Sequence, residues 1–306
     1  MCDLGPSHVP TPVRPLCIAL TAAFAVLTCT PAHAQRPPRP LLWRIADADS
    51  RVYLLGSVHA LRPGTDVLPG PAADAFADAE AVAFEVDFDA ARAGASAATM
   101  AGFATDGVAL SKRLGPADAQ RLARRIEPNG LSVAAVEAFK PWLMAVVLMT
   151  LPDGSAGLAA DAGADAVLFA RAGTEGKERL ALETIADQVA AFDGLPLKDQ
   201  LTMLRDALGD NEGDSLTALV DAWEAGDEDV LAAIVAGGLG RTSTMRRLFL
   251  TDRNARWVPQ IEAMLAREDS AGHPEDVFVV VGAGHLVGPG SVVEMLRSRG
   301  YTVERL

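Results

Sequence analysis

The segment Val277-Phe278-Val279-Val280-Val281-Gly282-Ala283-Gly284-His285 decides the fold that we expect for this chain. A run of β-branched residues closed by glycine is typical of a buried strand. A second apolar run, residues 52–55, leads into Gly56-Ser57-Val58-His59 and so has the same G-x-x-H ending. Two more apolar runs end on an acid, residues 81–84 on Glu85 and residues 180–182 on Glu183. Because ligands of open α/β sheets bind beyond the carboxyl ends of the strands, four parallel strands would bring two imidazoles and two carboxylates to one rim.

The remaining sequence predicts helices around these strands. Residues 41–46 and 51–55 indicate a hairpin, and residues 71–80 indicate a crossover helix towards Glu85. Because short crossovers place neighbouring strands side by side, we expect the strand of Glu85 beside the strand of His59. Helical patterns then dominate, and no Pro/Gly-rich linker divides the chain. We therefore expect one α/β domain with a mixed sheet, a strand-end rim and a large helical insertion. The expected segments are the domain at 35–306, the insertion at about 88–177 with helices at 116–126, 133–150 and 161–172, an acidic surface loop at 209–214 within helices over 184–267, and a closing strand at 301–306.

The first 34 residues have the features of a secretory leader. Residues 16–30 are apolar and uncharged, and Ala32-His33-Ala34 is a small-x-small cleavage signal, so we expect cleavage before Gln35. A lipoprotein that begins at Cys29 is the weaker alternative, because Thr28 stands where a smaller residue is usual. We therefore expect a protein exported to the periplasm or cell envelope, with no membrane span after the leader is removed.

The cysteine content and the net charge exclude some catalytic mechanisms and disfavour some binding partners. All three cysteines lie in the leader, so the processed chain has no thiolate ligand and no cysteine nucleophile. The formal net charge of −13 argues against nucleic acid or anionic lipid as the main partner. A peptide or a small molecule is the expected substrate.

Two of the three histidines beyond the leader, His59 and His285, follow a glycine turn after a predicted strand. A single histidine at a strand end often has only a structural role, such as donation to a carbonyl. The repeated spacing favours a functional role for both. His273 lies in the polar segment 270–275, so we expect its side chain at the surface.

The acidic and cationic candidates are more ambiguous. Glu85 ends an apolar strand, where a carboxylate is costly unless it is paired or bound to a metal, and Asp87 is a second-choice ligand two residues on. Glu183 is nearly as compatible with a cap on the following helix. Arg253 and Asn254 lie on a predicted helix, where such a pattern alone more often marks a surface ion pair. As a set, two imidazoles and two carboxylates suit a divalent metal or acid–base chemistry.

Several separated motifs occur in order along the chain: Leu54-Leu55-Gly56-Ser57-Val58-His59, Phe84-Glu85-Val86-Asp87, Lys140-Pro141-Trp142, Gly176-Lys177, Leu182-Glu183-Thr184 with Gln188, Trp223 with Gly226-Asp227, Arg253-Asn254 with Trp257, Gly282-Ala283-Gly284-His285-Leu286, and Arg299-Gly300-Tyr301-Thr302-Val303. On these motifs the chain resembles the TraB/GumN family, also called the TraB–PrgY–GumN group. One departure is local. Ala164-Asp165-Ala166 stands where relatives often read Val-Asp-Arg, which would remove a contact from the helical insertion.

That family is similar to the animal Tiki proteins, metal-dependent proteases with two G-x-x-H motifs that favour manganese or cobalt. It is more distantly similar to erythromycin-esterase-like proteins and to ChaN-like haem-binding proteins. The resemblance implies that His59 and His285 carry the site, and that Glu85, Glu183 and Arg253 are further members of it.

From these observations we expect metal-dependent hydrolysis, with a peptide bond as the first choice of target. His59, Glu85 and His285 would hold one divalent ion (Mn, Co or Zn), whose bound water ionises near neutral pH. Glu183 would act as the general base and Arg253 would stabilise the oxyanion. Two alternatives use the same rim. One is a non-catalytic periplasmic protein that binds haem or a peptide signal, and the other is metal-independent ester hydrolysis with a histidine as general base.

Overall fold

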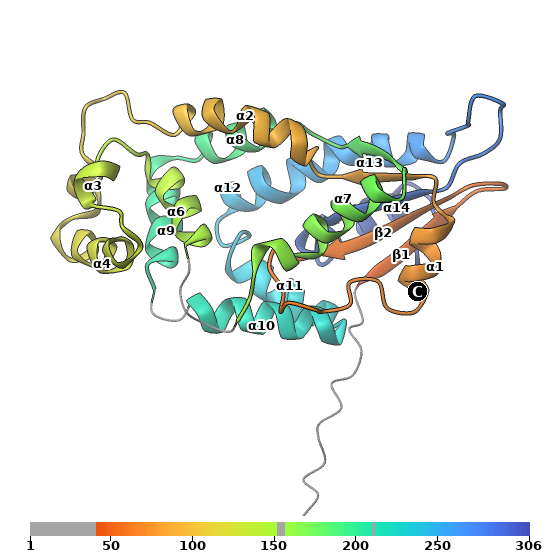
Figure 1. The fold of residues 1–306 in the computed structure, drawn as a ribbon, viewed down its shortest axis with the longest axis horizontal. Coiled ribbons are helices and arrows are strands. Elements are labelled where there is room, and N and C mark those ends of the chain that lie inside the picture. The colour runs from red at the N-terminus through yellow and green to blue at the C-terminus, as the bar shows by residue number, and fades with distance from the viewer. Residues whose placement is uncertain (1–40, 152–156, 210–211) are drawn as a thin grey trace, which may run out of the picture. The chain divides into compact units, whose positions relative to one another are not determined.

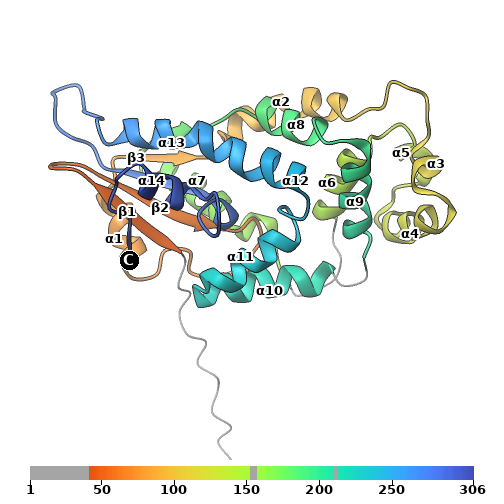
Figure 2. The same cartoon turned by 180° about the vertical axis from the view of Figure 1, so that it is seen from behind.

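A six-stranded mixed sheet, in the order β4-β3-β5-β2-β1-β6, forms the centre of the described chain (Figures 1 and 2). The computed structural model describes residues 41–151, 157–209 and 212–306. The predicted leader, its cleavage site and the residues up to 40 lie outside this part. The strands are β1 (Leu42–Ala46), β2 (Arg51–Ser57), β3 (Ala81–Phe84), β4 (Glu178–Ala181), β5 (Val277–Gly282) and β6 (Glu304–Arg305).

The four strands that precede the candidate residues are parallel. β2 pairs with β5, β5 with β3, and β3 with β4, all in parallel, whereas β1 and β6 are added antiparallel at the other edge. Parallel strands need crossover connections, and the helices between them supply these. The prediction of a mixed α/β sheet is therefore confirmed, and the strands that precede the candidate residues end at one edge of it.

One expected neighbour relation is wrong. Short crossovers predicted that the strand of Glu85 lies beside the strand of His59, but β5 lies between β3 and β2. β5 is apolar from Val277 to Val281 and all five of these residues are buried. Such a strand is stable only where both of its faces are covered, which is the centre of a parallel sheet.

Helices cover both faces of the sheet. α1 (Pro71–Asp78) and α7 (Ala164–Thr174) lie towards the viewer in Figure 1, and α13 (Asp252–Met264) and α14 (Val292–Ser298) lie towards the viewer in Figure 2. Phe76 of α1 packs edge-on against Phe278 of β5, with ring centroids 5.4 Å apart. Trp257 and Ile261 of α13 are fully buried in the same hydrophobic core.

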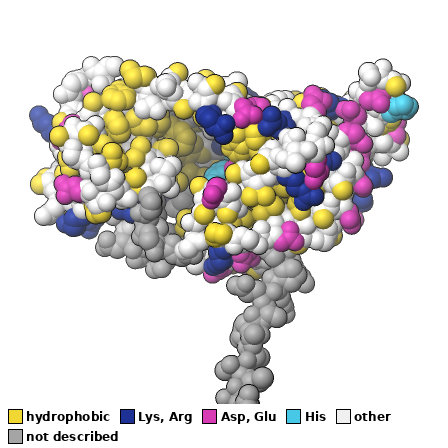
Figure 3. Space-filling model, in the orientation of Figure 1, with side chains coloured by type: hydrophobic (Ala, Val, Ile, Leu, Met, Phe, Trp, Pro, Cys, Tyr) yellow, Lys and Arg dark blue, Asp and Glu magenta, His cyan; other side chains and the backbone are white. Residues whose placement is uncertain are grey.

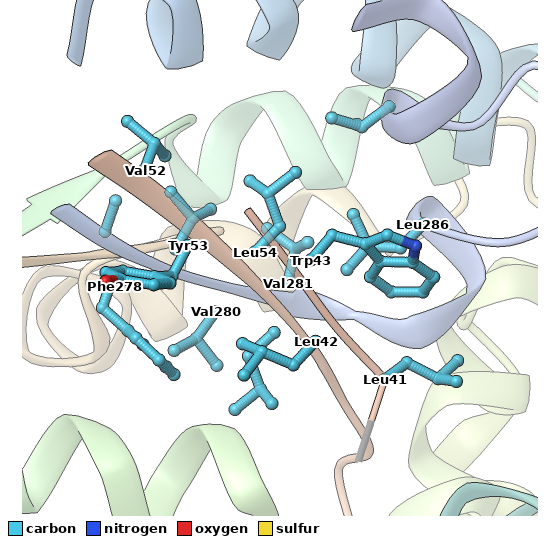
Figure 4. Close-up of a cluster of buried hydrophobic side chains, with 14 of the residues drawn as sticks. Leu41, Leu42, Trp43, Val52, Tyr53, Leu54, Phe278, Val280, Val281 and Leu286 are labelled. Carbon is cyan, nitrogen blue, oxygen red and sulfur yellow. The ribbon is translucent and has the colours of Figure 1, made fainter. Parts of the chain in front are cut away.

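The core at the β1–β2 edge is filled by large side chains from strands that are distant in sequence. Figure 4 shows Leu42, Trp43, Leu54, Phe278 and their neighbours packed on both faces of the sheet. Trp43 is 1% exposed, and the guanidinium of Arg305 in β6 lies 4.7 Å from its ring centroid. The closing strand is shorter than the predicted 301–306, because only Glu304 and Arg305 pair with β1.

The helical segments form a second hydrophobic cluster away from the sheet. The expected helix at 116–126 is confirmed as α4, whereas the expected helix at 133–150 is divided before Pro141, because the residue ahead of a proline avoids helical geometry.

The acidic stretch 209–214 is a loop only in part, since α10 begins at Glu212, and residues 210–211 lie outside the described chain. No helix among the described residues is long and apolar enough to cross a membrane. The remaining helices are α2 (Phe88–Ala101), α3 (Leu110–Leu114), α4 (Pro116–Ile126), α5 (Val133–Val136), α6 (Pro141–Thr150), α8 (Ile185–Asp193), α9 (Leu197–Ala207), α10 (Glu212–Ala225), α11 (Glu228–Gly237) and α12 (Ser243–Arg246), with a π-helical turn η3 (Arg247–Thr251) and 3-10 turns η1 (Glu127–Asn129), η2 (Ala160–Ala162) and η4 (Ala283–His285).

Candidate functional site

The predicted residues follow the carboxyl ends of four parallel strands. His59 follows β2, Glu85 follows β3, Glu183 follows β4, and His285 follows β5 in the turn η4. Parallel pairing places these ends at one edge of the sheet. Arg253 reaches the same edge from α13, the helix that packs behind the strands in Figure 1.

Arg253 connects both glutamates in one buried ion cluster. Its Nε donates to Oε1 of Glu183 at 3.0 Å, and its Nη2 lies 2.5 Å from Oε1 of Glu183 and 2.5 Å from Oε2 of Glu85. The Arg253 side chain is 11% exposed and that of Glu183 is 2% exposed. A buried carboxylate is stable only when paired, and the shared guanidinium satisfies both. The idea that Arg253 forms a surface ion pair is therefore wrong.

The backbone before α13 helps to hold Arg253. The π-helical turn η3 precedes α13, and Nη1 of Arg253 donates to the carbonyl of Phe249 in this turn at 3.1 Å. The guanidinium carbon also lies 4.7 Å from the centroid of the Trp257 ring. π-helical turns recur at functional sites because they redirect backbone groups. Arg253 is thus fixed on several sides.

His285 is a buried, neutral ring. It is 4% exposed, its Nδ1 lies 2.6 Å from Oδ1 of Asn254, and its Nε2 lies 3.1 Å from Nη1 of Arg253. Asn254 donates through Nδ2 to the carbonyl of Gly290, which leaves Oδ1 as an acceptor for the Nδ1–H of His285. Since arginine can only donate, Nε2 of His285 accepts. Burial lowers the pKa of His285 to about 3, and the positive charge of Arg253 contributes to the decrease.

His59 is held in the opposite way. Its Nδ1 lies 2.8 Å from Oδ2 of Asp165 in α7, and 75% of its side chain is exposed. The hydrogen bond to the carboxylate of Asp165 raises the pKa of His59 to about 9. α7 can approach this closely because its N-cap is Gly163, where a Cβ would lie 2.4 Å from the carbonyl oxygen of His59.

Glu85 links the two histidine environments. Its Oε1 accepts from the backbone N–H of Gly282 at 2.7 Å, and its Oε2 also accepts from Gln188 at 3.3 Å. Although burial alone would raise the pKa of Glu85, the neighbouring His285, Arg253 and His59 lower it to about 2. Glu85 is therefore a carboxylate throughout the physiological range.

A small pocket opens where His59 and Glu85 approach each other. Its volume is about 130 Å³. Figure 3 shows a hollow on this face of the molecule, with a histidine and an acidic side chain at its edge. The lining residues are Ser57, His59, Phe84, Glu85, Val86, Phe88, Asp165, Gln188 and Val280.

Contacts in the structure decide the roles of three further residues: Asp87 as an alternative ligand, Glu183 as a helix cap and His273 as a surface residue. Asp87 accepts from the backbone N–H of Ala90 at 2.8 Å and caps α2, so it is a helix cap and no alternative ligand. The cap of α8 is Thr184, which forms a capping box with Asp187, so Glu183 does not cap this helix. His273 is 76% exposed as expected, and it pairs with Asp269.

The sequence did not single out three residues that contact the candidates. In the sequence, Asp165 stands out only as part of the segment Ala164-Asp165-Ala166, which differs from the family pattern. In the structure, its carboxylate binds His59. Asn254 and Gln188 were named within motifs without a role, and they bind His285 and Glu85. The sequence signal for Asn254 and Gln188 is their position close to Arg253 and to Glu183, respectively. No periodicity relates Asp165 to His59.

The three expected metal ligands do not fit a divalent ion as they are arranged. The Nε2 of His285 accepts from Arg253, and both oxygens of Glu85 accept hydrogen bonds. A guanidinium cation therefore already neutralises the carboxylate. Among the described residues, no group of three or more His, Cys, Asp or Glu side chains has an arrangement that could hold a metal ion.

The fold and this rim define an α/β protein with a strand-end site, and comparison with known proteins supplies its family. The model of the TraB/PrgY/gumN family matches residues 41–305, and the chain belongs to this family. An uncharacterized protein of Treponema pallidum (strain Nichols) is 26% identical over 186 residues, covering 56% of this chain and 53% of that protein. The chain thus spans about half the length of this relative. No solved structure matches the chain.

Proposed function

We propose that this protein is a hydrolase in which His59, held by Asp165, activates a water molecule for attack on the carbonyl carbon of a peptide or another small acyl substrate. The geometry of His59 carries this proposal. Its Nδ1 is bonded to Asp165, and no hydrogen bond within the described residues engages its Nε2. The ring lines the pocket that Glu85 and Gln188 also line.

The carboxylate of Asp165 fixes the ring of His59 and its tautomer. With Nδ1–H donated to Asp165, the lone pair of the neutral ring is on Nε2. Nε2 takes a proton from water as the oxygen bonds to the carbonyl carbon. The resulting imidazolium then returns this proton to the leaving nitrogen or oxygen as its bond to carbon breaks. Because the pKa of His59 is raised to about 9, the neutral base becomes more abundant as the pH approaches 9.

The buried ion cluster has a positioning role in this proposal. All three nitrogens of Arg253 donate to Glu85, Glu183, His285 or the backbone. Arg253 therefore fixes Glu85 and His285, and the role of general base moves from Glu183 to His59. Gln188, whose amide lies at the pocket, is the candidate donor to the oxyanion.

The size of the pocket favours a small acyl group over a large cofactor. Small-molecule sites usually enclose about 300–1,000 Å³. A pocket of about 130 Å³ is well below this range. It suits a single small group beside His59, and it gives no support to the alternative of haem binding.

The experiment that tests the proposal compares two histidine–aspartate pairs of the same chain. We expect the purified protein to hydrolyse p-nitrophenyl esters or members of a peptide library in the presence of EDTA. We expect His59→Ala to reduce the rate by about 10²-fold or more, as for loss of a positioned base. His273→Ala is the matched control, because His273 is also exposed and lies 2.9 Å from the carboxylate of Asp269.

Two results would contradict the proposal. Activity that disappears on chelation and returns with manganese, cobalt or zinc would replace this proposal by the metal-dependent one. Elemental analysis of the purified protein provides the independent measurement. Equal activity of His59→Ala and His273→Ala would remove His59 from the reaction.

A further inference from the structure

The pocket beside His59 has a polar side and an apolar side. His59, Glu85, Asp165 and Gln188 line one side, and the other is lined by two phenylalanines and two valines, Phe84, Val86, Phe88 and Val280. Water activation uses the polar side alone. Phe84 and Val280 are only 1% exposed, so the half-buried Phe88 is the apolar side chain most available to contact the part of the substrate next to the reacting carbonyl.

Strand register explains why the apolar residues share one face. Phe84 of β3 is aligned with Val280 of β5 in parallel pairing, so both side chains project from the same face of the sheet. Val86 lies in the bend that follows β3 and lines the same pocket. The apolar side is thus built into the sheet.

Aromatic packing closes the apolar side. The ring of Phe88, at the start of α2, lies 4.9 Å from that of Phe169 in α7 and 6.4 Å from that of Phe84. Phe84 and Phe169 also pack edge-on at 5.2 Å, and Arg179 covers Phe169 at 4.2 Å. Three mutually packed rings hold their positions, so Phe88 has a fixed position in the pocket lining.

Size and charge define what this pocket accepts. A volume of about 130 Å³ corresponds to roughly four water molecules at about 30 Å³ each. The three carboxylates of Glu85, Glu183 and Asp165 exceed the two cations, Arg253 and His59, that pair with them at 2.8 Å or less, and the remaining negative charge disfavours an acidic group in the pocket. A group of a few carbon atoms without an acidic substituent satisfies both conditions.

We infer that this pocket is the acyl-group site of the protein, that it selects short uncharged apolar acyl groups or side chains, and that Phe88 is the specificity-determining residue that limits their length. This inference rests on the proposed hydrolase function for its substrate. The selection by size, however, applies to binding as well as to turnover, so the two can fail separately.

Hydrolysis of p-nitrophenyl butanoate and octanoate provides the first test. We expect kcat/KM of the wild type to be at least about tenfold higher for butanoate, since surplus methylenes in a fixed apolar pocket cost about 10-fold or more. Phe88→Ala should raise the octanoate-to-butanoate ratio by about tenfold. Phe139→Ala is the matched control, because Phe139 is half-buried and packs on Phe103 in the helical cluster, and it should leave the ratio unchanged.

Binding provides the second test, without turnover. Butanamide and octanamide are titrated into isotope-labelled protein, and shifts of the His59 ring resonances are followed by NMR. We expect saturation with butanamide at lower concentration than with octanamide, and a reversal in Phe88→Ala. If no ester is hydrolysed but these shifts appear, the hydrolase proposal fails and the pocket assignment stands. An unchanged chain-length preference in Phe88→Ala, in rates or in binding, would overturn the assignment.

Discussion

His59 and His285 have the same G-x-x-H sequence context and opposite physical environments. His59 is exposed, its partner is the carboxylate Asp165, and its pKa is raised to about 9. His285 is buried between the amide of Asn254 and the guanidinium of Arg253, and its pKa is lowered to about 3. A shared motif therefore fixes where each imidazole is placed. The partners from other segments decide which charge it has near neutral pH, where His59 is protonated and His285 is neutral.

The largest expected effect is a loss of stability when the buried ion cluster around His285 is broken. Arg253→Met would leave Glu85 and Glu183 buried without their shared cation. We expect the free energy of unfolding to fall by about 3–5 kcal/mol, the usual cost of breaking a buried ion pair. Chemical denaturation at pH 7 measures this loss.

Arg256→Met is the matched control for this substitution. Arg256 is 50% exposed and lies 3.8 Å from the same Glu183, so its removal should cost less than about 1 kcal/mol. If the two variants were equally stable, the Arg253 cluster would have no special structural role.

The second expected effect concerns the exposed side. Asp165→Asn keeps the size of the side chain but removes the charge that stabilises the His59 imidazolium. We expect the pKa of His59 to fall towards its ordinary value of 6.5 in an NMR titration. At pH 9 and above, where much of the wild-type His59 is already neutral, turnover should decrease by about 10²-fold, because an amide at this position also presents N–H to the ring and disturbs the tautomer of the base.

Asp269→Asn, in the surface pair with His273, serves for comparison. Its turnover should equal that of the wild type. A large activity loss in this variant as well would show that the assay responds to general destabilisation.

A smaller effect is expected at the amide that orients His285. Asn254→Ala leaves the Nδ1–H of a buried ring without its acceptor. This should lower the free energy of unfolding by about 1–3 kcal/mol, the cost of an unsatisfied buried donor. Asn129→Ala removes a half-buried side-chain bond to the carbonyl of Arg125 and should cost clearly less in the same denaturation experiment. Equal losses would contradict the buried role of Asn254.

The pH dependence of stability should have opposite signs for the two rings. The raised pKa of His59 stabilises the fold below pH 6.5, and this contribution is lost as the pH rises towards 9. The lowered pKa of His285 destabilises the fold as the pH falls from 6.5 towards 3, because only the unfolded chain binds that proton. Denaturation of His59→Ala should show a weaker loss of stability between pH 6.5 and 9 than the wild type does. A loss of the same size would exclude His59 as its source.

The sequence predicted the strands and their ends well, because their signals are local. Runs such as residues 277–281 closed by Gly282 define a buried strand, and the hairpin of β1 and β2 follows from its turn residues. The convergence of His59, Glu85, Glu183 and His285 then follows from parallel pairing alone. The order of the strands did not follow, because burial of β5 on both faces outweighs the preference for neighbours in sequence.

The partners of the site could not be derived in the same way. Asp165 lies in a helix that belongs to the insertion, and only its packing through Gly163 brings it to His59. The approach of Arg253 depends on the π-helical turn before α13, which no periodic pattern encodes. Contacts between distant segments decide the chemistry here, and a single sequence contains no direct record of them.

The central position of β5 also determines when the site can exist. β5 (Val277–Gly282) is synthesised after β2, β3 and β4, yet it pairs with both β2 and β3, the strands that precede His59 and Glu85. Pairing over such a separation slows folding, because the intervening chain must be ordered first. A nascent chain that has not reached His285 cannot contain the assembled rim.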